Sequence, residues 1–279
     1  MKMLTLIFFQ YFISTKKLYH SNKRGSAIPY LDKKLFYSTP FPLPPLAEQK
    51  RIVERLDSLF AKLDAAKKIL QDIVDGYELR RAAILHYAFT GKLTETFRRE
   101  NNLSLDDWQE KTLGEILFPM ETKRPTGEFF RYVDIDSIDN KRQAVKIPKI
   151  IETVNAPSRA SRAVDSDNIL FSMVRPYLKN IAFIDENLKD CIASTGFFVC
   201  QCNEKILPKF LYNFLRSEEA INYLMQFMKG GNSPSIRQDD FKSLPLSLPP
   251  LEEQKEIARR LESLLDKEAR TNPSRRLTR

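Results

Sequence analysis

The sequence predicts an α+β fold, in which a mixed α/β domain is flanked by long helices of the kind that form coiled coils. Two observations support this prediction. The segment LPPLAEQKRIVERLDSLF at 43–60 recurs as LPPLEEQKEIARRLESLL at 248–265, with 12 of 18 positions identical at a constant offset of 205. Between the two copies, short apolar runs are separated by Asn, Asp, Pro and Gly, which is typical of β-strands. A repeat this distant indicates a duplicated domain-and-helix module, because solenoid units span about 20–50 residues.

The first copy opens a long amphipathic helix. Pro44 and Pro45 precede it, and a proline suits the first helical turn because its fixed φ is helical and no N–H partner is needed there. Apolar residues then recur in alternating steps of four and three, which is a heptad seam that one helix cannot bury alone. The helix is expected to begin at 46 and to end between 86 and 98. Its seam residues are Ile52, Leu56, Leu59, Leu63, Leu70, Ile73, Tyr77 and Ile84.

The second copy predicts a shorter partner helix. Ile257, Leu261 and Leu264 occupy seam positions, but the apolar pattern then fails and Pro273 stops a helix. The second helix is therefore too short to cover the whole apolar seam of the first. The part expected to remain uncovered is roughly 63–84. A second copy of the chain could cover the excess in a two-fold homodimer, whose interface is self-complementary.

These patterns divide the chain into four segments. Residues 1–42 match only the C-terminal part of a domain, and 248–279 hold the shortened helix with a polar tail. Within 107–247, the apolar runs predict strands at 130–135, 146–151, 168–174, 180–184 and 195–202, and helical periodicity predicts a helix at 208–228. The expected boundaries are 1–42, 43–106, 107–247 and 248–279.

Charge and cysteine content restrict the class of protein. The net charge of +9 permits nucleic-acid binding, but residues 107–247 carry 19 basic and 19 acidic side chains, so a DNA face there requires local clustering. The three cysteines follow no zinc pattern and suit a reducing cytoplasm. The apolar start resembles a signal peptide, but Gln10 interrupts it and no small-residue cleavage site follows. A buried terminal helix and no membrane association are expected.

The sequence contains no convincing catalytic constellation. Phosphate-binding and dinucleotide-binding glycine motifs are missing. Asp134 and Asp136 alternate on an expected strand and could share a face suited to a metal, but the rest of a nuclease signature is not evident. Cys200 and Cys202 are expected to face the core, and His86 is expected to be packed or solvated. The chain is therefore predicted to be neither an enzyme nor a metal-binding protein.

Basic and hydroxyl side chains in the middle domain suit DNA contact. Base readout uses Arg, Asn and Gln donors, beside Lys and Arg on phosphates. The stretch APSRASRAV at 156–164, expected to be a loop, mixes both kinds. For each arginine an ordinary solvated charge is the alternative, and for Arg175 a structural ion pair is an equally good account. The candidates are Lys123, Arg124, Ser158, Arg159, Ser161, Arg162, Arg175, Lys229, Gly231, Asn232 and Ser233.

The chain resembles the specificity (S) subunit of type I restriction–modification enzymes, in a truncated form with one complete target recognition domain. The resemblance rests on LPPLxEQ at the start of both helices, AAILHYAFTGKL at 82–93, WQEKTLGEIL at 108–117, NILFSMVRPYLKNIAF at 168–183 and the GGNSPSI loop. It implies that 107–247 reads one half of a bipartite double-stranded DNA site. It also implies that the two helices pack antiparallel as spacers and hold methyltransferase (M) subunits. Segment 1–42 would be the remnant of a first recognition domain.

The resemblance further implies a cytoplasmic, non-catalytic subunit without a cofactor of its own. S-adenosylmethionine, ATP and magnesium would belong to the M subunit and to the restriction nuclease-translocase (R) subunit. The alternative is a truncated or decayed coiled-coil interaction protein without independent DNA recognition, which the shortened second helix favours. A free methyltransferase or nuclease is a third possibility, and the missing motifs argue against it.

Overall fold

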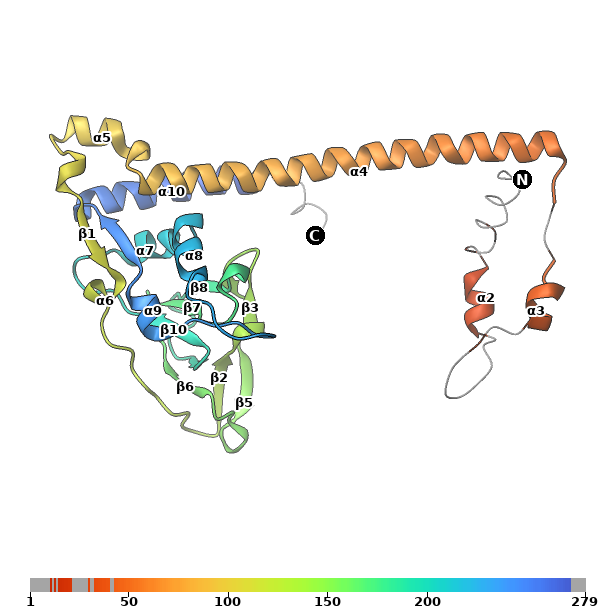
Figure 1. The fold of residues 1–279 in the computed structure, drawn as a ribbon. Helices are drawn as coiled ribbons and strands as arrows, with labels where there is room; N and C mark the ends of the chain where they lie inside the picture. Colours follow the sequence, from red (N-terminus) through yellow and green to blue (C-terminus); the bar gives the residue numbers. More distant parts are fainter. Residues whose placement is uncertain are drawn as a thin grey trace. The chain divides into compact units, whose positions relative to one another are not determined.

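The structure, a computed structural model of the 279-residue chain, describes residues 11, 13, 15–21, 30, 33–40 and 43–271. The chain divides into two compact units, residues 1–74 and 75–279. The terminal helix predicted at the start and the polar tail after residue 271 lie outside the described residues, as does much of the predicted remnant at 1–42. Within that remnant the described helices are α2 (Lys16–Ser21) and α3 (Lys33–Ser38), labelled in Figure 1.

Helix α4 (Leu46–Phe89) is the long helix that the heptad seam predicts. It begins directly after Pro44 and Pro45, as expected. It ends before Gly91, whose φ of 77° lies in the left-handed region that favours glycine and terminates helices. The prediction that helix continues to 98 is therefore wrong, because this turn separates α4 from the 3₁₀ helix η1 (Lys92–Thr94) and from α5 (Glu95–Glu100).

The middle domain is built on two main sheets. Strands β10 (Phe197–Cys200), β7 (Ile169–Ser172) and β8 (Ile181–Phe183) form an antiparallel sheet in that order. The second sheet has the order β5 (Lys149–Glu152), β2 (Phe129–Val133), β9 (Ile192–Ser194), β6 (Ala160–Ala163), and its β2–β9 pair is parallel. The five strands predicted from apolar runs are confirmed as β2, β5, β7, β8 and β10.

Six of the described strands escape the apolar pattern because they are short or polar. Strand β1 (Gln109–Thr112) pairs with β11 (Pro245–Leu248) and so joins the two ends of the domain. Strands β6 and β9 pair with each other in the four-stranded sheet. The small hairpin of β3 (Ile138–Asp139) and β4 (Ala144–Val145) forms a further sheet. Four 3₁₀ turns connect the elements: η2 (Leu105–Asp107), η3 (Ile135–Ser137), η4 (Thr153–Asn155) and η5 (Pro176–Leu178).

The helix predicted at 208–228 is two helices. Helix α7 (Pro208–Phe214) ends before Ser217, a buried residue whose hydroxyl accepts the Ala220 N–H and so caps α8 (Glu218–Met225). Serine competes for backbone hydrogen bonds in this way at helix starts, which explains the break. The remaining helices are α6 (Leu113–Ile116), α9 (Gln238–Lys242) and α10 (Leu251–Thr271).

The main core lies between the helices and the three-stranded sheet. Figure 1 shows α7 and α8 between that sheet and the pair formed by α10 and the end of α4. Leu85 and Ala88 of α4 are buried in the same cluster as Leu261 of α10 and Phe198 of β10. Helix α10 runs antiparallel to the end of α4, since Arg80 binds Glu268 at 3.0 Å while Arg260 donates to the Leu93 carbonyl at 2.6 Å.

The predicted seam residues occupy three kinds of environment. Ile257 and Leu261 are fully buried in the main core. Half-buried positions are Ile52, Leu56, Tyr77, Ile84 and Leu264. The exposed ones are Leu59 (47%), Leu63 (48%), Leu70 (48%) and Ile73 (39%).

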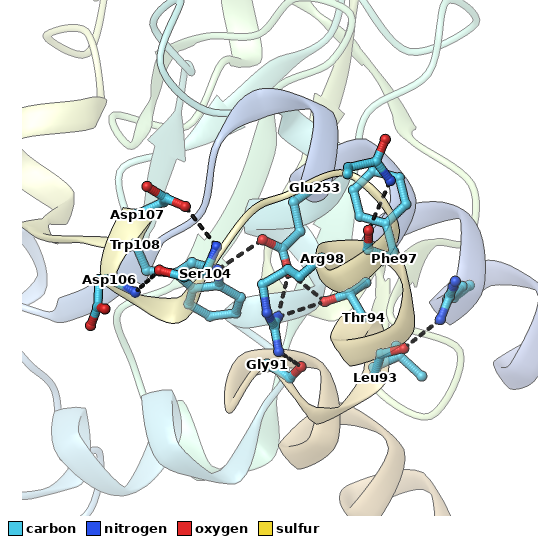
Figure 2. Close-up of polar contacts among 12 residues, drawn as sticks. Gly91, Leu93, Thr94, Phe97, Arg98, Ser104, Asp106, Asp107, Trp108 and Glu253 are labelled. Carbon is cyan, nitrogen blue, oxygen red and sulfur yellow. Dashed lines mark hydrogen bonds and ion pairs between the residues drawn. The ribbon is translucent and has the colours of Figure 1, made fainter.

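A buried polar cluster fixes the start of α10 to the turn after α4. The Glu253 carboxylate, which is fully buried, accepts hydrogen bonds from Thr94 and Arg98 at 2.5 Å and from the Trp108 indole at 2.9 Å. Arg98 also donates to the Gly91 carbonyl. Figure 2 shows these side chains converging on Glu253. Because a buried charge needs a partner, this cluster fixes the positions of α5, the start of β1 and α10 relative to one another.

Candidate nucleic-acid interface

The first group of predicted DNA-binding residues lies on β6 and on the segment beside it. The Lys123 N–H donates to the Ser161 carbonyl at 3.1 Å, and the Ala163 N–H donates to Glu121 at 3.1 Å, so residues 121–123 run along β6. The prediction that 156–164 is a loop is wrong over Ala160–Ala163, which form β6. The stretch forms a strand because β9 supplies backbone partners that the local sequence does not reveal.

These six residues differ in what they present to solvent. Ser161 is buried, and the half-buried Arg162 has an Nε atom that is buried without an acceptor in the described part of the chain. Lys123, Arg124, Ser158 and Arg159 are exposed. The exposed side chains are therefore the ones best placed to contact a ligand, Arg162 is partly accessible, and Ser161 belongs to the framework.

The second group surrounds the loop at 229–235. Lys229 and Ser235 close the loop with two backbone hydrogen bonds of 3.0 and 2.9 Å. Arg175 fastens it, because its N–H donates to Pro234 at 2.8 Å and its guanidinium donates to the Asn232 carbonyl. The ion-pair account of Arg175 is wrong among the described residues, since its partner is a backbone carbonyl. Exposed Gly231, Asn232 and Ser233 form the tip.

The turn between β9 and β10 links the two groups. The Thr195 N–H donates to the Arg159 carbonyl at 2.9 Å, and Gly196 accepts from the Met173 N–H at 2.9 Å, two residues before Arg175. We call the resulting set the basic surface: Lys123, Arg124, Arg159, Arg162, Arg175, Lys229 and the tip 231–233. None of its six cations forms a salt bridge within the described residues, whereas Lys149 and Lys179 of the same domain are neutralised by Asp134 and Glu218.

An open groove of about 500 Å³ adjoins the second group. Arg175 and Ser233 line it together with residues that the sequence did not single out. Among them, Asn140 of the β3–β4 hairpin and Asn180 next to β8 carry amides, and Lys146 after β4 carries a cation. Amides and cations are the donors and acceptors that base edges and phosphates require. Only the fold could reveal this contribution, because residues 140, 180 and 233 are far apart in sequence.

We expect Arg175→Ala to loosen the loop at 229–235. The substitution removes the hydrogen bond to Asn232 and leaves Arg175's left-handed backbone (φ 49°) without its side-chain anchor. The free energy of unfolding should fall by about 1–2 kcal/mol. Hydrogen exchange of the Lys229 and Ser235 amides should become faster. Exposed Arg237→Ala, just past the loop, serves as control, and unchanged exchange in Arg175→Ala would contradict the anchoring role.

The carboxylates considered for metal binding do not share a strand face. Asp134 lies at the N-terminus of η3 and accepts from the Ser137 hydroxyl at 2.8 Å and from Lys149. Burial favours a higher pKa for Asp134, but the Lys149 and Ser137 hydrogen bonds outweigh it, and the pKa lies below its usual range. That prediction is wrong because the chain turns at 135. The described residues contain no group of three or more His, Cys, Asp or Glu placed to hold a metal ion.

The remaining reactive side chains are held in structural roles. Burial raises the pKa of Cys200 and raises that of Cys202 to about 12, so both remain thiols at neutral pH. Exposed His86 contacts Glu219 of α8 at 2.5 Å. Among the described helices, none combines the length and the apolar character that a membrane span requires.

Comparison with known proteins identifies one family. The "Type I restriction modification DNA specificity domain" matches residues 2–74 and 105–274. The type I restriction enzyme EcoBI specificity subunit of Escherichia coli is 29% identical over 269 residues, covering 88% of this chain and 55% of that protein. The MjaVIII specificity subunit of Methanocaldococcus jannaschii is 27% identical, covering 88% and 59%. The chain thus spans a little over half the length of these relatives.

Solved structures agree with the sequence matches. The HsdS subunit from Thermoanaerobacter tengcongensis is 38% identical with a TM-score of 0.55, covering 61% of this chain and 44% of that one. A chain from a study of assembly and conformational transition of the type I R–M system has the same identity and coverage, with a TM-score of 0.56. Since the family match extends over most of the sequence, the chain belongs to the type I restriction–modification DNA specificity family.

Proposed function

We propose that this chain is a non-catalytic DNA-binding subunit that reads one half-site of a bipartite sequence for a type I restriction–modification system. The observation that carries the proposal is the basic surface. Its six cations, from four separate segments of one domain, have no salt-bridge partner within the described residues. Ordinary solvated charges have no reason to gather on one surface. A surface that binds duplex DNA does, because the phosphates attract cations.

The geometry suggests a division of labour on that surface. The exposed tip 231–233 and Lys229 suit phosphate, because successive backbone N–H groups and a flexible cation carry no sequence information. Arg159 and Arg124 are exposed and able to reach base edges, where a guanidinium pairs with guanine in the major groove. The groove at Asn140 and Asn180 adds amides of the kind that pair with adenine.

The long helix supplies the second part of the proposed function, which is assembly. Leu59, Leu63, Leu70 and Ile73 are large apolar side chains on one stripe of α4, each more than a third exposed. Such a stripe marks an interaction surface. We propose that the stripe serves homodimer formation and methyltransferase docking. S-adenosylmethionine chemistry would then come from the M subunit, with ATP and magnesium used by the R subunit, while this chain carries no cofactor.

The alternative, a decayed interaction protein without DNA recognition, is less well supported. In such a chain the recognition domain would be expected to accumulate damage. Here the two ends of the domain are joined by the β1–β11 pair, and buried residues from all its helices contribute to one core. The intact domain therefore favours DNA recognition.

We expect Arg159→Ala to weaken DNA binding without unfolding the domain. Arg159 is exposed and has no salt-bridge partner among the described residues, so its loss should cost about 1–3 kcal/mol if it reads a base, with relaxed selectivity at a single position. If it contacts phosphate, binding should fall equally for all sequences and the salt dependence should decrease. Affinity is measured by electrophoretic shift at several salt concentrations, with duplexes selected from a randomised pool.

Lys189→Ala provides the matched control for that experiment. Lys189 also carries one positive charge, but it is paired with Glu186 at 2.8 Å and precedes β9, at the opposite end from Thr195. Its loss should leave DNA affinity unchanged. Equal losses for both variants would indicate a general effect of net charge. No loss for Arg159→Ala would assign Arg159 to the solvated surface.

A further inference from the structure

The two LPPLxEQ motifs have the same local geometry but different surroundings. In the second copy, the N–H groups of Glu253 and Gln254 donate to the Pro250 carbonyl at 2.9 and 3.0 Å. In the first copy, Glu48 and Gln49 donate to Pro45 at the same two distances. The glutamine side chain also folds back in both, because each Nε2 donates at 2.8 Å to the proline carbonyl five residues earlier. The repeat thus preserves one local structure.

In the second copy, two further segments of the chain form hydrogen bonds with the motif. The Gln254 amide accepts the Leu207 N–H at 2.8 Å and donates to the Lys205 carbonyl at 2.9 Å. The Glu253 carboxylate accepts hydrogen bonds from Thr94, Arg98 and Trp108, as Figure 2 shows. Every polar atom of both side chains therefore has a partner, and both side chains are at least 99% buried.

In the first copy, the corresponding atoms lack such partners. Gln49 is only 4% exposed, yet its Oε1 atom is buried and accepts no hydrogen bond among the described residues. Glu48 is 40% exposed and makes a surface pair with Arg51 at 2.8 Å. An unsatisfied buried amide oxygen is unfavourable and therefore requires an explanation, and the satisfied second copy of the motif points to a missing partner.

We propose that the first motif, Leu43–Gln49, binds a second polypeptide through a segment that resembles residues 90–108 of this chain. The occupant would present a Thr-x-x-x-Arg helix followed by a tryptophan to Glu48. A separate segment, corresponding to residues 205–207, would supply the backbone N–H to Gln49. This chain's own segment is already held by Glu253, so the occupant belongs to another polypeptide. Its binding does not depend on DNA recognition, because the motif lies apart in sequence from the basic surface.

The test uses the full chain and a fluorescein-labelled peptide of residues 90–108, TGKLTETFRRENNLSLDDW. Fluorescence anisotropy should show saturable binding. Glu48→Gln should weaken it about tenfold or more, since hydrogen bonds to a charged acceptor are lost. Gln49→Ala should bind the peptide unchanged, because the segment that corresponds to the partners of Gln254, residues 205–207, is not in the peptide. A peptide with Arg98→Gln should also lose affinity. Exposed Glu54→Gln, on the same helix, should bind as the unaltered chain does.

These controls separate docking from simple charge attraction. The peptide carries three basic and four acidic side chains, a net charge of −1, and the chain carries +9. Glu48→Gln makes the chain more positive, and Arg98→Gln makes the peptide more negative, so charge attraction alone would strengthen binding in both cases. Circular dichroism verifies that the variants keep their helix content. Absent binding, or binding unaffected by Glu48→Gln, overturns the proposal.

Discussion

Replacing Glu253 with alanine should lower the free energy of unfolding by about 3–5 kcal/mol, which is the typical cost of removing one partner of a buried ion pair. Glu253 is fully buried, and the Arg98 side chain is 8% exposed. Without the carboxylate, Arg98 keeps a buried charge and Trp108 loses the acceptor of its indole N–H. The start of α10, helix α5 and the entry into β1 should loosen together, because all three meet at this carboxylate.

Urea unfolding followed by circular dichroism measures this effect, and the fluorescence of Trp108, the single tryptophan, reports on the cluster directly. Glu252→Ala is the matched control, because Glu252 is the exposed neighbour on the same first turn. The double variant Glu253→Leu with Arg98→Met should recover much of the lost stability, since an apolar pair replaces the buried charges. A loss below about 1 kcal/mol in Glu253→Ala would show that water solvates the site.

The sequence predicts those parts of the fold that depend on local pattern. Apolar runs identify strands whose residues are all buried, such as β7 and β10, because burial on both faces requires continuous apolar side chains. The heptad seam and the double proline locate the start of α4. The polar strands β1 and β6 could not be predicted, because their partners are distant in sequence and their side chains follow no alternating pattern.

Prediction of the candidate site is limited in the same way, because the site depends on contacts between segments that are distant in sequence. Residue type and composition select Arg159 and the tip 231–233, but they also select Ser161, which the β6 pairing buries. Asn140 and Asn180 line the groove only because the fold brings their separate chain segments together. The partners of Glu253 come from positions more than 140 residues earlier in the chain, so no local signal could distinguish it from exposed Glu252. The internal repeat is the one long-range feature that the sequence reveals. It identifies the LPPLxEQ motif but not the residues that contact Glu253.

Replacing both Leu59 and Leu63 with aspartate should abolish self-association of the chain. A two-fold axis beside residue 61 brings Leu59 opposite Leu63 of a second, antiparallel copy. The same axis brings Leu56 opposite Ala66, and Ile52 opposite Leu70. Each pairing therefore joins apolar side chains, and an antiparallel coiled coil requires this agreement along the seam. The uncovered stripe differs from the 63–84 that the sequence suggested, because Ile84 packs against the main core and Tyr77 is half-buried.

Light scattering of the purified chain, alone and with its methyltransferase, measures the outcome. The unaltered chain should be a dimer, and Leu59→Asp with Leu63→Asp should be a monomer, because buried unpaired carboxylates cost about 3–5 kcal/mol each. Ala61→Asp with Ala65→Asp is the matched control. It adds the same charge in the same turns, but about half a turn away from the seam, so it should remain dimeric. A monomer for the unaltered chain in both conditions would exclude the two-fold arrangement, and with it recognition of a symmetric, interrupted DNA site by two identical domains.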